Sequence, residues 1–243
     1  MVGASSLDQI SPLIDDSGTI VVFEARGDPI PGIFAVVQGS PARKLCSGCN
    51  NPTSWFDGSR AVFYREGIPS SIKMADLNTR ESAIVLAANG MSLGNAAWSP
   101  ENQYLLFTAS AASSKNQIFA VRFPSSTGKI AGKWVPITDP QEWGDRPRWS
   151  GDGKTVFYIS TRDGFHCVWG QHFDAEVGRV TGSPFPIKHY HDLRISPALV
   201  AWRNFGVSVA GDSIYLNPGE ESETIWVGKL KRRASLGVFN GLR

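Results

Sequence analysis

The segment Trp149-Ser150-Gly151-Asp152-Gly153-Lys154-Thr155-Val156-Phe157-Tyr158 decides the fold of this chain. It places a turn residue shortly before three apolar residues, and the same arrangement occurs five times along the sequence. The turn residues are Gly18, Gly58, Asn102, Gly153 and Gly211. The apolar triplets are Val21-Val22-Phe23, Ala61-Val62-Phe63, Leu105-Leu106-Phe107, Val156-Phe157-Tyr158 and Ile214-Tyr215-Leu216. Self-similarity of this kind indicates a repeat architecture.

The spacing of the turn residues narrows the fold class. Successive turns lie about 40 to 58 residues apart, and a repeat of roughly 40–50 residues suits one four-stranded blade of a β-propeller. The sequence therefore predicts an all-β, five-bladed β-propeller of four-stranded antiparallel blades in a single domain, residues 1–243. The expected blades are 9–46, 47–90, 91–140, 141–200 and 201–243.

Each triplet is followed by a second expected strand that is rich in β-branched and aromatic residues. These strands are Gly32–Val37, Ser71–Leu77, Gln117–Phe123, Cys167–Gln171 and Thr224–Leu230. The triplets do not alternate between apolar and polar residues, so both faces of the strand are expected to be buried. Face-to-face packing of neighbouring blades would bury them. A helix is excluded because the apolar runs are short and are interrupted by Gly, Pro, Asn and Ser.

Two segments resemble a known family of repeats. Trp98-Ser99-Pro100-Glu101-Asn102 and Trp149–Lys154 are similar to the Trp-Ser-Pro-Asp-Gly-Lys signature of TolB-type β-propellers, and Thr161-Arg162-Asp163-Gly164 resembles the turn that follows it. In the second repeat Trp55 lies three residues before its glycine rather than four. The resemblance implies the fold and a binding role. The repeated Trp is expected to pack between blades, since an indole buries a large apolar area.

Composition agrees with one β domain and excludes several classes of function. The chain has 243 residues, 25 Gly, 15 Pro, 8 Trp and a net charge of +2, which does not favour nucleic acid as a partner. No apolar run is long enough to insert into a membrane. No signal peptide is visible at the start, although the resemblance favours a periplasmic or other extracytoplasmic location.

The cysteines and histidines give no clear sign of a metal or cofactor. Cys46-Ser47-Gly48-Cys49 lacks a second ligand pair for zinc and lacks the histidine of a haem site, which leaves a local disulfide or two thiols. Cys167 is expected to be a buried small apolar residue. All four histidines fall between His166 and His191, but nearness in sequence does not establish convergence. We therefore expect no cofactor and no metal ligands.

The innermost strands are expected to precede the turns and to line the central channel. They are Gln9–Ile14, Asn50–Trp55, Gly94–Trp98, Asp145–Trp149 and Asn204–Val209. Asp145 is the single acid among them, with Glu142 on the loop before it, so the carboxylate pair of a glycosidase is missing. No Gly-x-Ser-x-Gly elbow occurs either. We expect no catalytic residues, and an enzyme is the less favoured interpretation.

Polar and aromatic residues gather on or just before these strands, where loops of all blades meet at the channel mouth. Asn, Arg and Trp suit recognition by hydrogen bonds and stacking, although such residues can also simply solvate a channel. The candidate ligand-binding residues are Trp143, Asp145, Arg146, Arg148, Asn50, Asn51, Asn95, Arg203 and Asn204. The expected function is a non-catalytic scaffold that binds a protein or peptide there. The alternative is a carbohydrate-binding lectin or a divergent glycoside-active enzyme that uses the same site.

Overall fold

The structure is a computed structural model, and it describes residues 8–26, 31–56, 60–112, 114–124, 129–191, 194–200, 205–211 and 213–220. These residues form four four-stranded antiparallel sheets and two two-stranded ones, with one short 3₁₀ turn, η1 (Pro197–Leu199). The all-β class is therefore confirmed. No helix in the described part of the chain is long and apolar enough to cross a membrane.

Each four-stranded sheet is a meander in which strands adjacent in sequence are paired. Sheet one comprises β1 (Asp8–Ile14), β2 (Ile20–Arg26), β3 (Gly32–Val37) and β4 (Arg43–Ser47). Sheet two comprises β5 (Cys49–Phe56), β6 (Ala61–Glu66), β7 (Ser71–Asp76) and β8 (Ser82–Leu86). Sheet three comprises β9 (Met91–Trp98), β10 (Tyr104–Ala111), β11 (Gln117–Arg122) and β12 (Ala131–Pro136). Sheet four comprises β13 (Gly144–Trp149), β14 (Thr155–Ser160), β15 (Cys167–Asp174) and β16 (Arg179–Lys188).

The last described residues form two smaller sheets. β18 (Val207–Ala210) pairs with β19 (Ser213–Leu216), and β17 (Ile195–Ser196) pairs with β20 (Gly219–Glu220). The expected strand Thr224–Leu230 lies outside the described residues, so the fifth blade and the blade boundaries stay predictions. The first four expected second strands are confirmed as β3, β7, β11 and β15.

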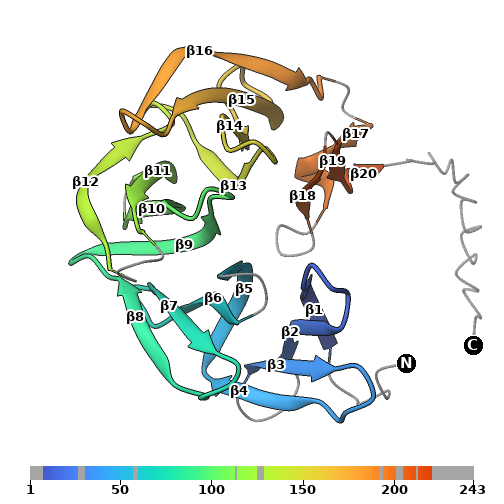
Figure 1. Cartoon of the computed structure of the whole chain (residues 1–243). Coiled ribbons are helices and arrows are strands. Elements are labelled where there is room, and N and C mark those ends of the chain that lie inside the picture. The colour runs from blue at the N-terminus through green and yellow to red at the C-terminus, as the bar shows by residue number, and fades with distance from the viewer. Residues whose placement is uncertain are drawn as a thin grey trace, which may run out of the picture.

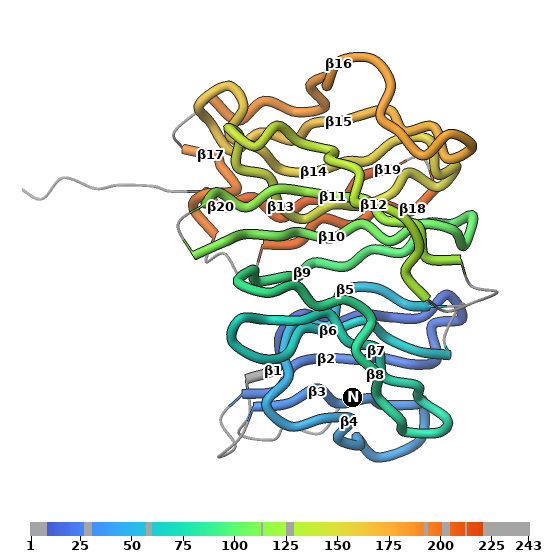
Figure 2. Tube along the Cα trace, turned by 90° about the vertical axis from the view of Figure 1, so that its left-hand side faces the viewer, coloured from blue at the N-terminus to red at the C-terminus, as the bar shows by residue number. Residues whose placement is uncertain are grey.

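The sheets stand around a central opening in the order of the chain (Figure 1). Strands β1, β5, β9, β13 and β18 are innermost, and successive members of this series contact one another. Figure 2 shows β1–β8 in the lower half of the side view and β9–β20 in the upper half. This is the propeller arrangement that the repeat predicts.

Apolar clusters fill the spaces between successive sheets. One cluster joins Val22 and Ile33 of sheet one to Val62 and Tyr64 of sheet two, and equivalent clusters join sheets two to three, three to four and four to the β18–β19 hairpin. The expected burial of both strand faces is clearest in β10, where Leu105, Leu106 and Phe107 are completely buried.

Two details of the expected repeat differ from the structure. The fifth triplet is only partly buried: Ile214 and Leu216 pack against apolar clusters, whereas Tyr215 is 60% exposed. The second repeat keeps the common register: Trp55 pairs with Val62, just as Trp98 pairs with Leu105 and Trp149 with Val156. The buried triplet equivalent to the others is therefore Val62-Phe63-Tyr64, one residue later than expected; Gly58 itself lies outside the described residues.

Candidate functional site

Each of the four complete innermost strands has a β-bulge at the same place. The register of pairing with the next strand shifts near Ser11 in β1, Asn51 in β5, Asn95 in β9 and Arg146 in β13. These four residues have positive φ angles of 52°, 53°, 49° and 56°. A bulge bends its strand and redirects side chains. Since the strands surround one opening, the four bulges form a collar around it.

A chain of hydrogen bonds runs along this collar from sheet one to sheet four. The Asn51 backbone N–H donates to Glu24 Oε2 at 2.9 Å, and Asn51 Nδ2 donates to Asn95 Oδ1 at 3.1 Å. Asn95 Nδ2 in turn donates to Asp145 Oδ1, which also accepts from the Arg146 backbone N–H. Glu24 and Asp145 are only 2% and 3% exposed. A buried carboxylate needs hydrogen-bond donors to offset the loss of its hydration, and this network supplies such donors to both acids.

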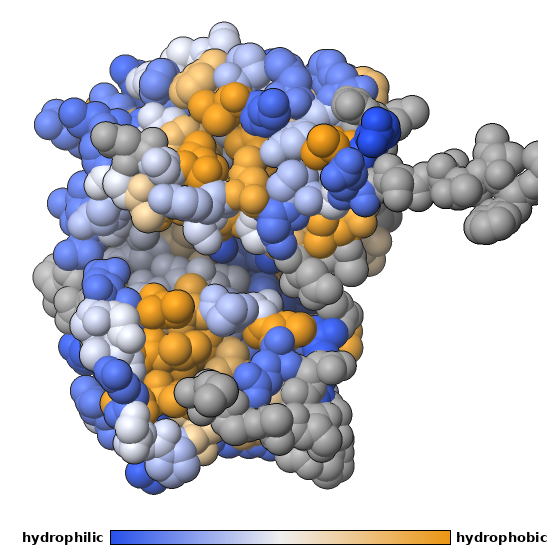
Figure 3. Space-filling view, turned by 90° about the vertical axis from the view of Figure 1, so that its right-hand side faces the viewer, coloured by the Kyte–Doolittle hydropathy of each residue, from blue (hydrophilic) through white to orange (hydrophobic). Residues whose placement is uncertain are grey.

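A cavity of about 600 Å³ lies on one side of the collar. Sheets one to four all contribute to its wall, mainly through polar side chains. The polar, charged and aromatic side chains that line it are Ser11, Glu24, Arg26, Asn50, Asn51, Arg65, Ser92, Asn95, Thr108, Ser110, Asn116, Trp143, Asp145, Arg146 and His166. Figure 3 shows the molecule hollowed between its two halves. A space of this size is within the range of small-ligand sites.

Positive charge predominates among the groups of the cavity that can meet a ligand. Arg26 forms an ion pair with Glu24 at 2.6 Å, yet its side chain remains 31% exposed. Arg65 is exposed and forms no ion pair with the described residues. Burial lowers the pKa of Arg146, and arginine in proteins remains protonated at neutral pH. The two carboxylates, by contrast, already accept hydrogen bonds within the collar.

An aromatic pair stands at the fourth sheet. The rings of Trp143 and His166 meet edge to face, with centroids 5.2 Å apart, and both residues line the cavity. Burial lowers the pKa of His166, so its imidazole is neutral at pH 7 and offers one donor and one acceptor nitrogen. The pair therefore adds aromatic area to a wall that is mainly polar.

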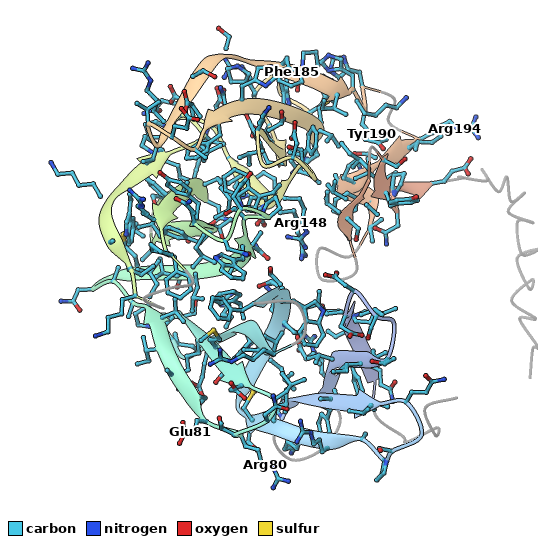
Figure 4. The ribbon with its side chains drawn as sticks, in the orientation of Figure 1. Arg80, Glu81, Arg148, Phe185, Tyr190 and Arg194 are labelled. Atoms are coloured by element: carbon cyan, nitrogen blue, oxygen red, sulfur yellow. A yellow bond between two sulfur atoms is a disulfide. The ribbon has the colours of Figure 1, made fainter. Side chains whose placement is uncertain are left out.

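A second space, about 1400 Å³, lies at the other ends of the innermost strands. It shares Ser11, Asn51 and Arg146 with the first cavity, so the collar separates the two. Arg148 lines it, points into the central opening (Figure 4), and donates from Nε to the Val207 carbonyl at 2.9 Å. Burial, together with the charge of Arg146, lowers the pKa of Arg148 to about 10. Its bond to β18 gives Arg148 a role in joining sheet four to the next hairpin.

The sequence-predicted site residues fall into three groups. Asn50, Asn51, Asn95, Trp143, Asp145 and Arg146 line the first cavity together. Arg148 belongs to the opposite space. Arg203 and Asn204 lie outside the described residues.

Several cavity residues were missed because they are not on the innermost strands. Glu24 and Arg26 end β2, and Arg65 is near the end of β6. Glu24 directly follows the buried residues Val22 and Phe23, and Arg26 comes two residues later. Arg65 directly follows the buried residues Phe63 and Tyr64. A charged residue at the end of a doubly buried strand is a signal that could have identified them, since a charge there needs a partner or an opening.

A second group of chemically capable side chains lies away from the channel, at the turn between β14 and β15. Asp163, Cys167, His189 and His191 each bring one potential ligand atom within 4.8 Å of the others. Two histidines do converge here, whereas His166 faces the cavity and His172 packs against Phe185 on β15 and β16.

The similarity of this chain to known proteins lies in its structure. No family model matches the sequence, and no curated protein matches it. Solved structures do match. TolB from Acinetobacter baumannii aligns with a TM-score of 0.59 at 17% identity, covering 90% of this chain and 53% of TolB. A TolB of Agrobacterium tumefaciens gives 0.55 at 17% identity, covering 71% of this chain and 64% of that one.

A peptidase shares the same architecture. The puromycin-hydrolyzing peptidase of Mycobacterium tuberculosis aligns with a TM-score of 0.59 at 16% identity, covering 78% of this chain and 32% of the peptidase. The chain thus spans between about a third and two thirds of the length of these proteins. At such identities the likeness establishes the fold alone: this chain has a TolB-type β-propeller fold.

Proposed function

We propose that this chain is a non-catalytic propeller that binds a protein or peptide segment in the cavity at the mouth of its central opening. The observation that carries the proposal is the collar, because its hydrogen bonds hold side chains of four sheets around one space of about 600 Å³. A preorganised wall of this kind loses little conformational entropy on binding. The TolB-type fold of the structural neighbours is consistent with a protein-binding scaffold.

The charges of the cavity favour a ligand with a carboxylate. Arg26 and Arg65 present guanidinium groups that water can reach, and a guanidinium pairs with a carboxylate through two parallel hydrogen bonds. Glu24 and Asp145 oppose this less strongly, because both are buried, both accept hydrogen bonds from the collar, and the three arginines of the wall outnumber them. An aspartate or glutamate side chain, or a peptide C-terminus, has the required chemistry.

The aromatic pair favours a peptide over a small free acid. Trp143 and His166 add apolar area next to the charged wall, which suits a segment that places an apolar side chain beside its acid. Interfaces of this mixed character use aromatic and arginine residues as anchors. We therefore expect an acidic residue with an apolar neighbour as the minimal recognised unit.

A peptide-display selection tests the proposal. The immobilised chain is screened with random peptides, and the selected sequences are resynthesised with each acid replaced by its amide. Acid-to-amide replacement is expected to weaken binding at least tenfold. Arg65→Ala is the cleanest protein variant because Arg65 is exposed. Arg179→Ala, which changes an exposed arginine on β16, is the matched control and is expected to bind like the wild type.

Two results would contradict the proposal. Selected peptides that bind Arg65→Ala and Trp143→Ala as well as the wild type place the site elsewhere. Binding of an acidic oligosaccharide in the same cavity, with no peptide selected, supports the carbohydrate-binding alternative instead. Melting temperatures of all variants are measured in parallel, so that a loss of binding is not confused with unfolding.

A further inference from the structure

The side-chain cluster near the β14–β15 turn has the composition of a metal site. Asp163 lies in the turn and Cys167 begins β15, while His189 and His191 lie on the segment that follows β16. Their ligand atoms all lie within 4.8 Å of one another. One carboxylate and one thiolate together carry two negative charges, which neutralise a divalent cation. With the two neutral imidazoles they form a mixture of oxygen, sulfur and nitrogen donors that suits zinc.

The distances admit a tetrahedral ion once the side chains shift: the atoms that meet at Asp163 must move apart, and wider pairs, up to 4.8 Å, must move together. Asp163 Oδ2 is 2.8 Å from His189 Nδ1 and 2.9 Å from His191 Nε2. Ligand atoms around tetrahedral zinc are separated by roughly 3.3–3.6 Å, as follows from metal–ligand bonds of about 2.0–2.3 Å. The two imidazole nitrogens therefore need to move about 0.5 Å away from Asp163 Oδ2 so that the ion fits between the three atoms.

Neighbouring groups already orient the four side chains. The Phe165 backbone N–H donates to Asp163 Oδ1, which leaves Oδ2 for the histidines. The Tyr190 backbone N–H donates to Cys167 Sγ at 3.2 Å. The imidazole of His189 meets the ring of Trp169 edge to face at 5.6 Å, and that of His191 lies against Phe165 at 4.5 Å. Hydrogen-bond partners of this kind hold metal-binding side chains in place in metalloproteins.

We propose that Asp163, Cys167, His189 and His191 bind one Zn²⁺ ion. Four protein ligands complete a tetrahedral shell, which is typical of structural rather than catalytic zinc. The ion would join the β14–β15 turn to the segment where the chain leaves β16 toward β17, next to Tyr190 (Figure 4). It would thereby anchor the outermost strand of sheet four. Binding releases the proton of the Cys167 thiol to solvent.

The other cysteines and histidines, all of which the structure describes, lie outside the cluster. Cys46 and Cys49 form a disulfide, so the third cysteine, Cys167, is the free thiol of the chain. His172 lies on β15 outside the cluster, with its Nδ1 3.3 Å from Thr155 Oγ1. His172→Ala is therefore a matched control that removes an imidazole from the same sheet.

The test is metal binding by the whole chain. Protein freed of metal by a chelator is titrated with Zn²⁺ and, separately, with Co²⁺, whose absorption reports a thiolate ligand and a four-coordinate site. We expect one equivalent of either ion, a cobalt–thiolate charge-transfer band, and a melting temperature that rises with zinc. His189→Ala and His191→Ala are expected to weaken zinc binding at least tenfold, while His172→Ala binds as the wild type does.

The histidine variants keep the proposal falsifiable. The side chains of His189 and His191 are 44% and 49% exposed, so their replacement should leave the fold intact, whereas Cys167→Ser changes a completely buried residue. A wild-type chain that takes up no zinc at micromolar concentration overturns the proposal. So does zinc binding of equal strength in His189→Ala, His191→Ala and the wild type.

Discussion

Asn51 and Asn95 combine two properties that few residue types share. Each occupies the left-handed region of the backbone, with φ of 53° and 49°, and each uses its side-chain amide to bridge neighbouring sheets. Asparagine enters this region more readily than most residues. Asparagine thus tolerates the positive φ angle of the bulge, and its side-chain amide also forms the hydrogen bond to the next sheet. The collar depends on this pairing of backbone and side-chain behaviour.

Substitutions at Asn95 separate the two contributions. Asn95→Gly keeps the backbone conformation and removes the amide, so it leaves Asn51 and Asp145 each with one partner fewer, and should cost about 1–3 kcal/mol. Asn95→Ala also strains the backbone and should be a further 1–2 kcal/mol or so less stable. Urea unfolding measures both values. Equal stability of the two variants would show that the bulge does not need its positive φ.

Phe107 tests the core at the level of one side chain. It is completely buried in sheet three, 5.8 Å from Phe119 and 4.8 Å from Trp134 by ring centroids. Phe107→Ala leaves a cavity and should destabilise the protein by about 3–5 kcal/mol. Ile84→Ala, at a position 62% exposed, is the control and should change the stability by less than about 0.5 kcal/mol. A wild-type denaturation midpoint for Phe107→Ala would contradict the observed packing.

At this scale the sequence indicates part of the site. Asp145 and Asn95 are predictable because they precede a repeated Trp on an innermost strand, and repeated spacing brings such positions to one axis. Glu24 is not predictable in this way, because its burial depends on a hydrogen bond from Asn51, which is 27 residues away. The convergence of His189 with Asp163 depends likewise on how the chain returns after β16.

At the scale of elements, the repeated Trp explains how neighbouring sheets are held in register. Trp55 Nε1 donates to the Ile14 carbonyl of β1, and Trp149 Nε1 donates to the Ala97 carbonyl of β9. Each indole thus bonds to the innermost strand of the preceding sheet while its ring packs in the interface. The expected place of this Trp between blades is confirmed at both positions. Trp98 Nε1 donates instead to the carbonyl of Phe123, the residue that follows β11 of its own sheet.

Strand positions were largely predictable from sequence, and the exceptions have physical causes. Turn residues and apolar triplets locate the first two strands of each repeat because both strands are buried. The outermost strands carry weaker signals: β12, for example, has no fully buried residue. In the second repeat the expected triplet begins one residue early because Gly58 follows Trp55 by three residues instead of four in the sequence, whereas Trp55 pairs with Val62 as in the other repeats.

The disulfide joins β4 of sheet one to β5 of sheet two, and its removal tests whether the two sheets can pack together without it. Cys46 on β4 and Cys49 on β5 connect the last strand of sheet one to the first strand of sheet two. A loop this short gains little from cross-linking, about 2–3 kcal/mol or less. The Cys46→Ser/Cys49→Ser variant should therefore still unfold cooperatively, at a lower denaturant concentration. Circular dichroism monitors the transition, and failure of the double variant to fold would show that the sheets need this link.

At the scale of the whole molecule, the ring is held by interfaces between successive sheets rather than by one central core. The middle of the ring is polar, and the apolar clusters lie between the sheets. This division places the ligand cavity where the loops and bulges of several sheets meet, while stability resides in the interfaces. Residues 201–243 would complete a fifth blade by the repeat argument, and this stays a prediction.

Turn carboxylates distributed around the ring should make stability depend on acid pH. A hydroxyl hydrogen bond from Ser17 holds the pKa of Asp15 below its usual value, one from Ser150 does so for Asp152, and the Thr79 backbone N–H does so for Asp76. A lowered folded-state pKa contributes stability that is complete above the unfolded value of about 3.9 and is lost as the pH falls through the folded values. The stability that these three carboxylates contribute should therefore be constant between about pH 5 and 7 and decline below about pH 4.

Asp76→Asn tests whether the turn carboxylates cause this decline. The amide keeps an oxygen acceptor for the Asn78 and Thr79 N–H groups but carries no charge that acid can remove. The variant should be less stable than the wild type at pH 7, and the difference should shrink toward pH 3, because the wild-type carboxyl is then protonated as well. Denaturant midpoints at pH 7, 5 and 3 measure this. A difference that is the same at all three values would assign the role of Asp76 to its shape rather than to its charge.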